Sequence, residues 1–252
     1  MRLKFFAICI FIFTPVKGQL LTSTEIDALS NQYFMDGVYQ LNEFLKIPNY
    51  GGKPKNIQDN LEWLSDVFNQ LEFEVETLSF NGVDHLYAEK IINSDYRTIL
   101  FYLQIDGQPV DPSQWNQASP HNPVLKDCTE GECVQLEFDE LSQNINMDWR
   151  IFARSASDSK GPAIAFIQSI KILQDLNIDP AFNIKVIMDF QEELGSPSLP
   201  FLVEQHQEKF NADALLIMDG TRPPGNLPTL TFGADRKSTR LNSSHLVISY
   251  AV

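Results

Sequence analysis

Three short, largely apolar runs constrain the fold of this 252-residue chain more than any other feature. They are Ile99–Ile105, Ile184–Phe190 and Ala214–Met218. Runs of this length are typical of strands that are buried on both faces of a parallel sheet. We therefore expect these three segments to form the centre of a sheet.

Longer amphipathic segments alternate with these runs. Apolar residues at three- and four-residue spacing predict helices, and two further apolar segments predict strands. The expected helices are Ser23–Ile47, Ile57–Leu71, Gly161–Leu176 and Leu199–Phe210, and the further strands are Phe73–Phe80 and Leu86–Ile92. This alternation predicts an α/β sandwich with a largely parallel or mixed sheet.

Both ends of the chain differ in composition from the middle. Residues 1–18 combine two early basic residues, a twelve-residue apolar run and a small residue, Gly18. This pattern predicts a signal peptide and hence a secreted or periplasmic protein. The apolar run is shorter than the about 20 residues that a membrane-spanning helix needs, so we expect no membrane span.

The last eighteen residues, 235–252, resemble the translation of a sequencing adapter. We interpret them as adapter-derived and expect the natural protein to continue differently beyond Ala234. The part of the chain expected to fold is therefore residues 19–234.

Charge and cysteine content limit the class of protein further. The chain has 19 Lys and Arg residues against 33 Asp and Glu residues and no basic cluster, so we exclude nucleic acid as a partner. Cys128 and Cys133 lie in the segment CTEGEC, and an oxidising compartment favours a disulfide between them. A zinc knuckle would need two further ligands nearby, and the sequence around them has none.

Acidic residues follow the predicted strands or precede a predicted helix. These residues are Asp106, Asp158, Glu192, Glu193 and Asp219. Each has an ordinary explanation by itself, as a helix cap, a turn residue or a solvated side chain. Ligands of open α/β sheets bind at the carboxyl ends of the strands, and carboxylates gathered there would repel one another without a cation. Together these residues therefore indicate a divalent metal site.

Four motifs resemble, in order, those of the aminoacylase/carnosine-dipeptidase family of di-zinc metallopeptidases. They are YLQIDGQPVD at 102–111, ARSASDSKGP at 153–162, FQEELGS at 190–196 and LLIMDG at 215–220. A fifth segment, TLTFGA at 229–234, resembles the strand before that family's lid domain. The resemblance implies that residues 19–234 are the N-terminal part of a zinc-exopeptidase-like catalytic domain, with a homodimer formed through a lid domain outside this segment.

The resemblance also implies a role for each acidic residue. Asp158 matches the carboxylate that bridges two Zn²⁺ ions, while Glu193 and Asp219 each match a ligand of one ion. Glu192 matches the general base, and Asp106 matches the acid that orients a metal-binding histidine. The implied reaction is hydrolysis of the amide bond of a small peptide by metal-activated water, of the exopeptidase or dipeptidase type.

One departure from the family pattern leaves alternatives open. Gln104 occupies the position of the usual metal-binding histidine, and an amide is a poorer zinc ligand than imidazole. The family's last histidine ligand lies beyond residue 234, so we expect this chain alone to be inactive. The alternatives are an N-acyl-amino-acid deacylase of the same fold and a non-catalytic binding descendant. His85, in a predicted strand, and His206 are expected to be structural or solvated.

Overall fold

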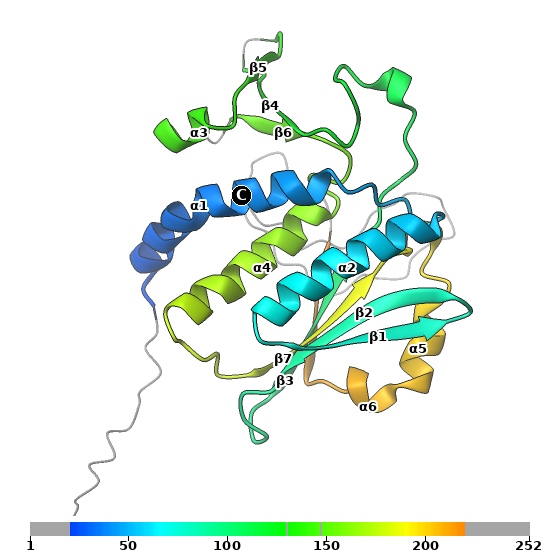
Figure 1. Ribbon diagram of the computed structural model, residues 1–252. Helices are drawn as coiled ribbons and strands as arrows, with labels where there is room; N and C mark the ends of the chain where they lie inside the picture. The colour runs from blue at the N-terminus through cyan, green and yellow to red at the C-terminus, as the bar shows by residue number, and fades with distance from the viewer. Residues whose placement is uncertain (1–20, 130, 147, 220–252) are drawn as a thin grey trace, which may run out of the picture.

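A five-stranded mixed sheet forms the centre of the molecule, as a computed structural model of residues 21–129, 131–146 and 148–219 shows (Figure 1). Its strand order is β1-β2-β7-β3-β8. The strands are β1 (Glu74–Phe80), β2 (Val83–Lys90), β3 (Thr98–Gln104), β7 (Asn183–Asp189) and β8 (Ala214–Met218). β2 runs antiparallel to β1 and β7, whereas β3 runs parallel to β7 and β8. The predicted α/β class with a parallel or mixed sheet is confirmed.

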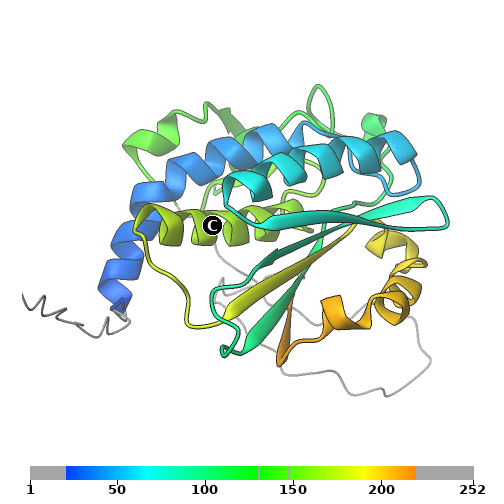
Figure 2. The ribbon, with the colours of Figure 1, turned by 60° about the horizontal axis from the view of Figure 1, so that its bottom comes forward.

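Helices cover both faces of this sheet. Three long helices lie on one face and two short ones on the other, so the molecule has three layers (Figures 1 and 2). The long helices are α1 (Ser23–Leu45), α2 (Pro54–Gln70) and α4 (Lys160–Asp175), and the short ones are α5 (Leu199–Gln205) and α6 (Gln207–Phe210). The sequence thus predicted the three long helices to within a few residues at each end.

The main hydrophobic core lies between the sheet and the three long helices. The helices contribute residues spaced three and four apart, and the sheet contributes alternate residues of β3 and β7. Members of this core include Leu61, Leu64, Phe68, Phe101, Leu103, Phe166, Ile170, Val186 and Met188. Burial of each such side chain stabilises the fold by roughly 1.5–3 kcal/mol. This core therefore fixes the position of the sheet, whose edge carries the acidic residues.

Local contacts define both ends of α1. The helix begins with a capping box, in which Glu25 N donates to Thr22 Oγ1 at 3.3 Å and Thr22 N donates to Glu25 Oε2 at 2.8 Å. At the other end, the buried Lys160 Nζ donates to the carbonyl oxygens of Phe44 and Ile47, both at 2.8 Å. Lys160 thereby ties the end of α1 to the start of α4.

Two predicted elements differ from the structure. The predicted helix Leu199–Phe210 is two helices, because His206 leaves the helical region with φ −122° and ψ 41°. β8 was expected to be buried, but Leu215 and Ile217 are 56% and 36% exposed. Leu215 and Ile217 alternate with Leu216 and Met218, which pack into the main core, so the exposed pair lies on the opposite face of the sheet.

A small second sheet, for which the sequence predicted no strands, interrupts the chain between β3 and α4. It contains β4 (Val124–Asp127), β5 (Val134–Leu136) and β6 (Arg150–Phe152) and lies beyond α1 from the main sheet (Figure 1). The short helices η1 (Pro112–Gln114) and α3 (Glu140–Gln143) belong to the same excursion. A disulfide between Cys128 and Cys133 links β4 to β5 and confirms the predicted pairing.

Several predictions fall outside the described residues. These are the signal peptide at 1–18, the TLTFGA segment at 229–234 and the adapter-like segment at 235–252. Among the described residues, no helix is both long enough and apolar enough to cross a bilayer.

Candidate active site

The acidic residues gather where the parallel strands of the main sheet end. Gln104 pairs with Asp189, and Leu103 pairs with Met218, so β3, β7 and β8 finish at the same edge. The loops that follow carry Asp106, the glutamate pair and Asp219. The predicted convergence at the carboxyl ends of the strands is therefore present.

Asp106 is buried and binds backbone, not a histidine. Its Oδ1 accepts a hydrogen bond from Glu192 N at 2.9 Å, and its Oδ2 accepts one from Glu193 N at 3.2 Å. Both donors belong to the 3₁₀ turn η2 (Glu192–Leu194). Burial raises the pKa of Asp106 to about 8, and the nearby Asp189 carboxylate adds to this effect, although the two N–H groups oppose it. The structure thus makes Asp106 the support of the turn that carries both glutamates.

A glycine brings a neighbouring loop against this support. A Cβ atom on Gly51 would lie 2.3 Å from the carbonyl oxygen of Phe190 and 2.9 Å from Asp106 Oδ2. Asn49, on the same loop, donates from Nδ2 to Ile105 O at 2.7 Å and to Ser155 Oγ at 2.9 Å. Only a residue without a side chain allows this close packing around Asp106.

Asp158 and Asp219 meet at one hydroxyl group. Ser159 Oγ lies 2.8 Å from Asp158 Oδ1 and 3.0 Å from Asp219 Oδ1, and the peptide bond between Asp158 and Ser159 is cis. A hydroxyl has a single proton and donates to one acceptor at a time. Two residues that are 61 positions apart in the sequence therefore place their carboxylates within reach of one group.

Glu193 lies within electrostatic range of this pair. Burial raises its pKa, and the charges of Asp158 and Asp219 add to the rise, while a hydrogen bond from Gln108 Nε2 and the charge of Arg154 oppose it. The three residues predicted as metal ligands are therefore neighbours. Glu192, the predicted base, shares the η2 turn with Glu193.

Gln104 occupies a buried position in the last row of β3. Its side chain is 1% exposed, and its Nε2 has no hydrogen-bond partner among the described residues. The histidines predicted to be structural or solvated differ from each other: His85 is fully buried, with Nδ1 3.5 Å from Asp189 Oδ1, and His206 is half-buried where α5 ends. Among the described residues, position 104 thus holds an amide where the family resemblance implies an imidazole.

The donor types suit a divalent metal, but the set is incomplete. Carboxylate oxygens bind zinc and other divalent cations, and the shared hydroxyl between Asp158 and Asp219 shows two of them facing one point. Within residues 21–129, 131–146 and 148–219, however, no group of three or more His, Cys, Asp or Glu side chains is arranged to hold an ion. The predicted ligands are gathered at one edge without forming a closed coordination sphere.

The sequence missed several residues that shape the site. Asp189 is buried directly behind the glutamate turn, Ser159 joins the two aspartates, and Arg154 lies over Trp115 with Cζ 5.6 Å from the ring centre. Asp189 had one detectable signal, since an acidic residue at the end of an otherwise apolar strand needs buried partners. Ser159 and Arg154 carried no such signal.

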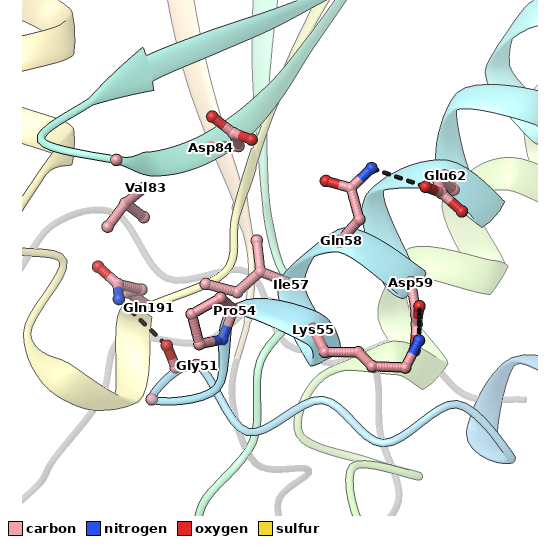
Figure 3. Close-up of a pocket in the computed structure, with 12 residues that line it drawn as sticks. Gly51, Pro54, Lys55, Ile57, Gln58, Asp59, Glu62, Val83, Asp84 and Gln191 are labelled. Carbon is pink, nitrogen blue, oxygen red and sulfur yellow. Dashed lines mark hydrogen bonds and ion pairs between the residues drawn. The ribbon is translucent and has the colours of Figure 1, made fainter.

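A pocket of about 580 Å³ lies beside the carboxylates but contains none of the predicted site residues (Figure 3). It is bounded by the start of α2, by the β1–β2 turn at Val83 and Asp84, and by Gln191, whose Nε2 donates to Gly51 O at 3.1 Å. The pocket thus reaches Gln191, the residue directly before the glutamate turn.

The amino-acid sequence is similar to those of known dipeptidases. The chain is 30% identical over 152 residues to human beta-Ala-His dipeptidase, covering 60% of this chain and 25% of that protein. It is 28% identical over 177 residues to the cysteinylglycine-S-conjugate dipeptidase of Corynebacterium striatum, covering 69% of this chain and 34% of that protein. The chain therefore spans only about a quarter to a third of these relatives.

Solved structures share the fold. An M20 family metallo-carboxypeptidase from Sulfolobus solfataricus aligns with a TM-score of 0.62 and 30% identity over 76% of this chain and 39% of that one. Human carnosine dipeptidase 1 aligns with a TM-score of 0.60 and 24% identity over 77% of this chain and 41% of that one. The family model described as Peptidase family M20/M25/M40 matches residues 100–232, which include all five predicted site residues. Because this match covers more than half of the chain, the protein belongs to peptidase family M20/M25/M40.

Proposed function

We propose that this chain is part of an exopeptidase or dipeptidase. The enzyme would depend on divalent metal and hydrolyse the amide bond of small peptides. The observation that carries the proposal is the meeting of Asp158 and Asp219 at Ser159 Oγ, with Glu193 beside them, in a member of a peptidase family. The relatives named above as dipeptidases support the substrate class.

Each acidic residue has a role in this proposal. Asp158 would bridge two Zn²⁺ ions, Glu193 and Asp219 would each bind one of them, and the bound metal would supply positive charge that polarises the amide carbonyl and acidifies water. Glu192 would accept the proton of the attacking water and return it to the leaving amine. Asp106 would keep the backbone of both glutamates in place through its two hydrogen bonds.

Gln104 favours a second candidate function, which is binding without catalysis. Its buried amide replaces the imidazole that the family resemblance implies, and its Nε2 lacks a partner among the described residues. A site with this substitution would hold one of its metals less tightly. Such a protein would keep the fold and bind peptides without hydrolysing them.

One experiment separates the two candidates. The protein is purified from its natural source, its zinc content is measured, and it is assayed with beta-Ala-His, Cys-Gly and N-acetylated amino acids. Two zinc ions with dipeptide hydrolysis would support the proposal, whereas hydrolysis of the N-acetylated substrates alone would indicate a deacylase. Absence of both metal and hydrolysis would leave peptide binding as the function.

We also propose that the protein is exported. The predicted signal peptide at 1–18 and the disulfide between Cys128 and Cys133 support this, because disulfides persist in oxidising compartments. Secreted protein should begin near Gln19 when its N-terminus is sequenced. An intact Met1 on the secreted protein would contradict the proposal. The homodimer implied by the family resemblance should be visible by light scattering of the same material.

A further inference from the structure

A buried carboxylate outside the predicted metal-binding set holds the glutamate turn from behind. Asp189 ends β7, is 0% exposed and lies three residues before Glu192. Its Oδ1 accepts a hydrogen bond from Gln191 N at 2.9 Å. Its Oδ2 accepts hydrogen bonds from Ser196 Oγ at 2.5 Å and from Tyr102 Oη at 3.0 Å. One carboxylate therefore receives three donors.

Two of these donors, Gln191 and Ser196, lie on either side of the two glutamates. Gln191 precedes Glu192, and Ser196 follows the turn that Glu193 belongs to. The turn also closes on itself, because Ser196 N donates to Gln191 O at 2.9 Å and Gly195 N donates to Glu192 O at 2.7 Å. Asp189 thus joins the beginning and the end of the loop at one buried point.

The sheet keeps Asp189 in place from the sides. In the β3–β7 register Gln104 is its partner, and on the β2 side His85 Nδ1 lies 3.5 Å from Asp189 Oδ1. Burial lowers the pKa of His85 more than the Asp189 charge raises it, so this neighbour supplies no full positive charge. Burial also keeps the pKa of Tyr102 well above its ordinary value, and Asp189 adds to this effect, so the hydroxyl remains a donor.

Burying a carboxylate without a cationic partner is costly, and the cost is reduced only by such hydrogen bonds. The three donors converge on Asp189 from β3 and from both ends of the glutamate loop. They therefore couple the position of that loop to the rigid centre of the sheet. A carboxylate that only stabilised the fold as a whole would not need donors from both ends of one short loop.

We propose that Asp189 is a positioning residue, which holds the loop of Glu192 and Glu193 against the sheet while Asp106 holds the backbone N–H groups of the same loop. This inference rests on the proposed function for the roles of Glu192 and Glu193. It adds that the geometry of the loop depends on Asp189, with Tyr102 and Ser196 as its donors.

The test measures hydrogen–deuterium exchange of the whole 252-residue chain in the presence of a chelator, so that neither metal nor activity is needed. In Asp189→Asn, amide exchange at residues 191–196 should accelerate on the order of tenfold, the scale expected for loss of a charged hydrogen bond. Tyr102→Phe and Ser196→Ala each remove one donor and should accelerate exchange there several-fold. Peptides from α4 should be unchanged in all three variants.

Tyr87→Phe is a matched control. Tyr87 and Tyr102 are both paired with Ile187 across the sheet, so they lie in one row, but Tyr87 Oη lies 2.8 Å from Glu89 Oε2 and 3.1 Å from Lys209 O, away from Asp189. This variant should leave exchange at residues 191–196 unchanged. If Tyr102→Phe and Ser196→Ala leave the loop unchanged, or accelerate exchange equally in α4, Asp189 has no specific positioning role. The two single-donor variants decide the matter even where Asp189→Asn fails to fold.

A second measurement links the loop to the metal site. Co²⁺ is added to the chelator-free chain and its visible absorption is recorded. The band should change in Tyr102→Phe and stay the same in Tyr87→Phe, because only the former disturbs the support of Glu193. An unchanged band in Tyr102→Phe would count against the inference. If the wild-type chain gives no band, the metal site of the proposed function is in doubt, and the exchange data alone decide the role of Asp189.

Discussion

Two groups of carboxylates lie at the same edge of the sheet, and the partners of their side chains distinguish their roles. The inner pair, Asp106 and Asp189, is almost fully buried and accepts hydrogen bonds from backbone, tyrosine and serine donors. The outer group consists of the exposed Asp158, the half-buried Glu193 and the buried Asp219, which approach one another. The same residue type therefore supports the loop in one layer and is available to a ligand in the other.

The comparison shows why an acidic residue near a strand end is an incomplete sign of a metal ligand. A carboxylate whose lone pairs already accept protein donors has little capacity left for a cation. A carboxylate that faces another carboxylate is stabilised by a cation between them. The distinction depends on the partners of each side chain, and the following predictions test it in order of decreasing effect.

The largest effect should come from Glu192, whose backbone N–H donates to Asp106 and whose side chain is the proposed general base. In metal-loaded protein expressed from the natural gene, Glu192→Gln should lower kcat on the order of a hundredfold to ten-thousandfold, because the amide cannot accept the proton of water. Zinc content should stay normal. Steady-state kinetics and metal analysis of the same preparation check both statements, and near-normal turnover would remove Glu192 as the base.

The inner and outer aspartates should respond in opposite ways to truncation. Asp106→Ala leaves two partly buried N–H groups without their acceptor, and its unfolding free energy should fall by about 3 kcal/mol. Asp158→Ala removes an exposed side chain and should lose zinc affinity with no measurable change in stability. Urea unfolding and zinc titration of both variants provide the comparison. Equal losses of stability would erase the distinction between the layers.

Tight packing around the inner pair should make Gly51 intolerant of a side chain. Gly51→Ala places a methyl group 2.3 Å from Phe190 O, and relief of this overlap should cost about 2 kcal/mol of unfolding free energy. Gly37→Ala is the control, because the nearest atom there is the flexible Gln168 side chain at 3.3 Å. Thermal melts of the two variants check the prediction, and a Gly51→Ala protein as stable as wild type would contradict the close packing.

The smallest effect should come from restoring the imidazole at position 104. Gln104→His should tighten zinc binding on the order of tenfold, a scale known for changes around metal sites, because imidazole is the better ligand. Isothermal titration of the 252-residue chain measures this, with Gln143→His on the exposed face of α3, away from the site, as a control. An unchanged zinc affinity would mean that residue 104 belongs to the inner, structural layer.

The sequence predicted the main sheet and the long helices because their signals are local and repeated. The apolar run Ile99–Ile105 and the helical spacing of Phe166 and Ile170 each extend over many residues, so small errors at the ends do not change the element. The second sheet was missed for the opposite reason. Its strands, such as Val134–Leu136 and Arg150–Phe152, are three residues long and too short for a period to be detected.

The sequence by itself determined the α/β architecture and the disulfide pair. It also determined that the acidic residues lie at one edge of the sheet. These follow from hydrophobic spacing and from the rule that parallel strands end together, both of which depend on residue order alone. Only the tertiary structure decided which carboxylates support the loop and which face each other. That decision depends on partners far away in the chain, as when Tyr102 donates to Asp189 and Ser159 reaches Asp219, because the free energy of a buried charge is set by the donors that surround it.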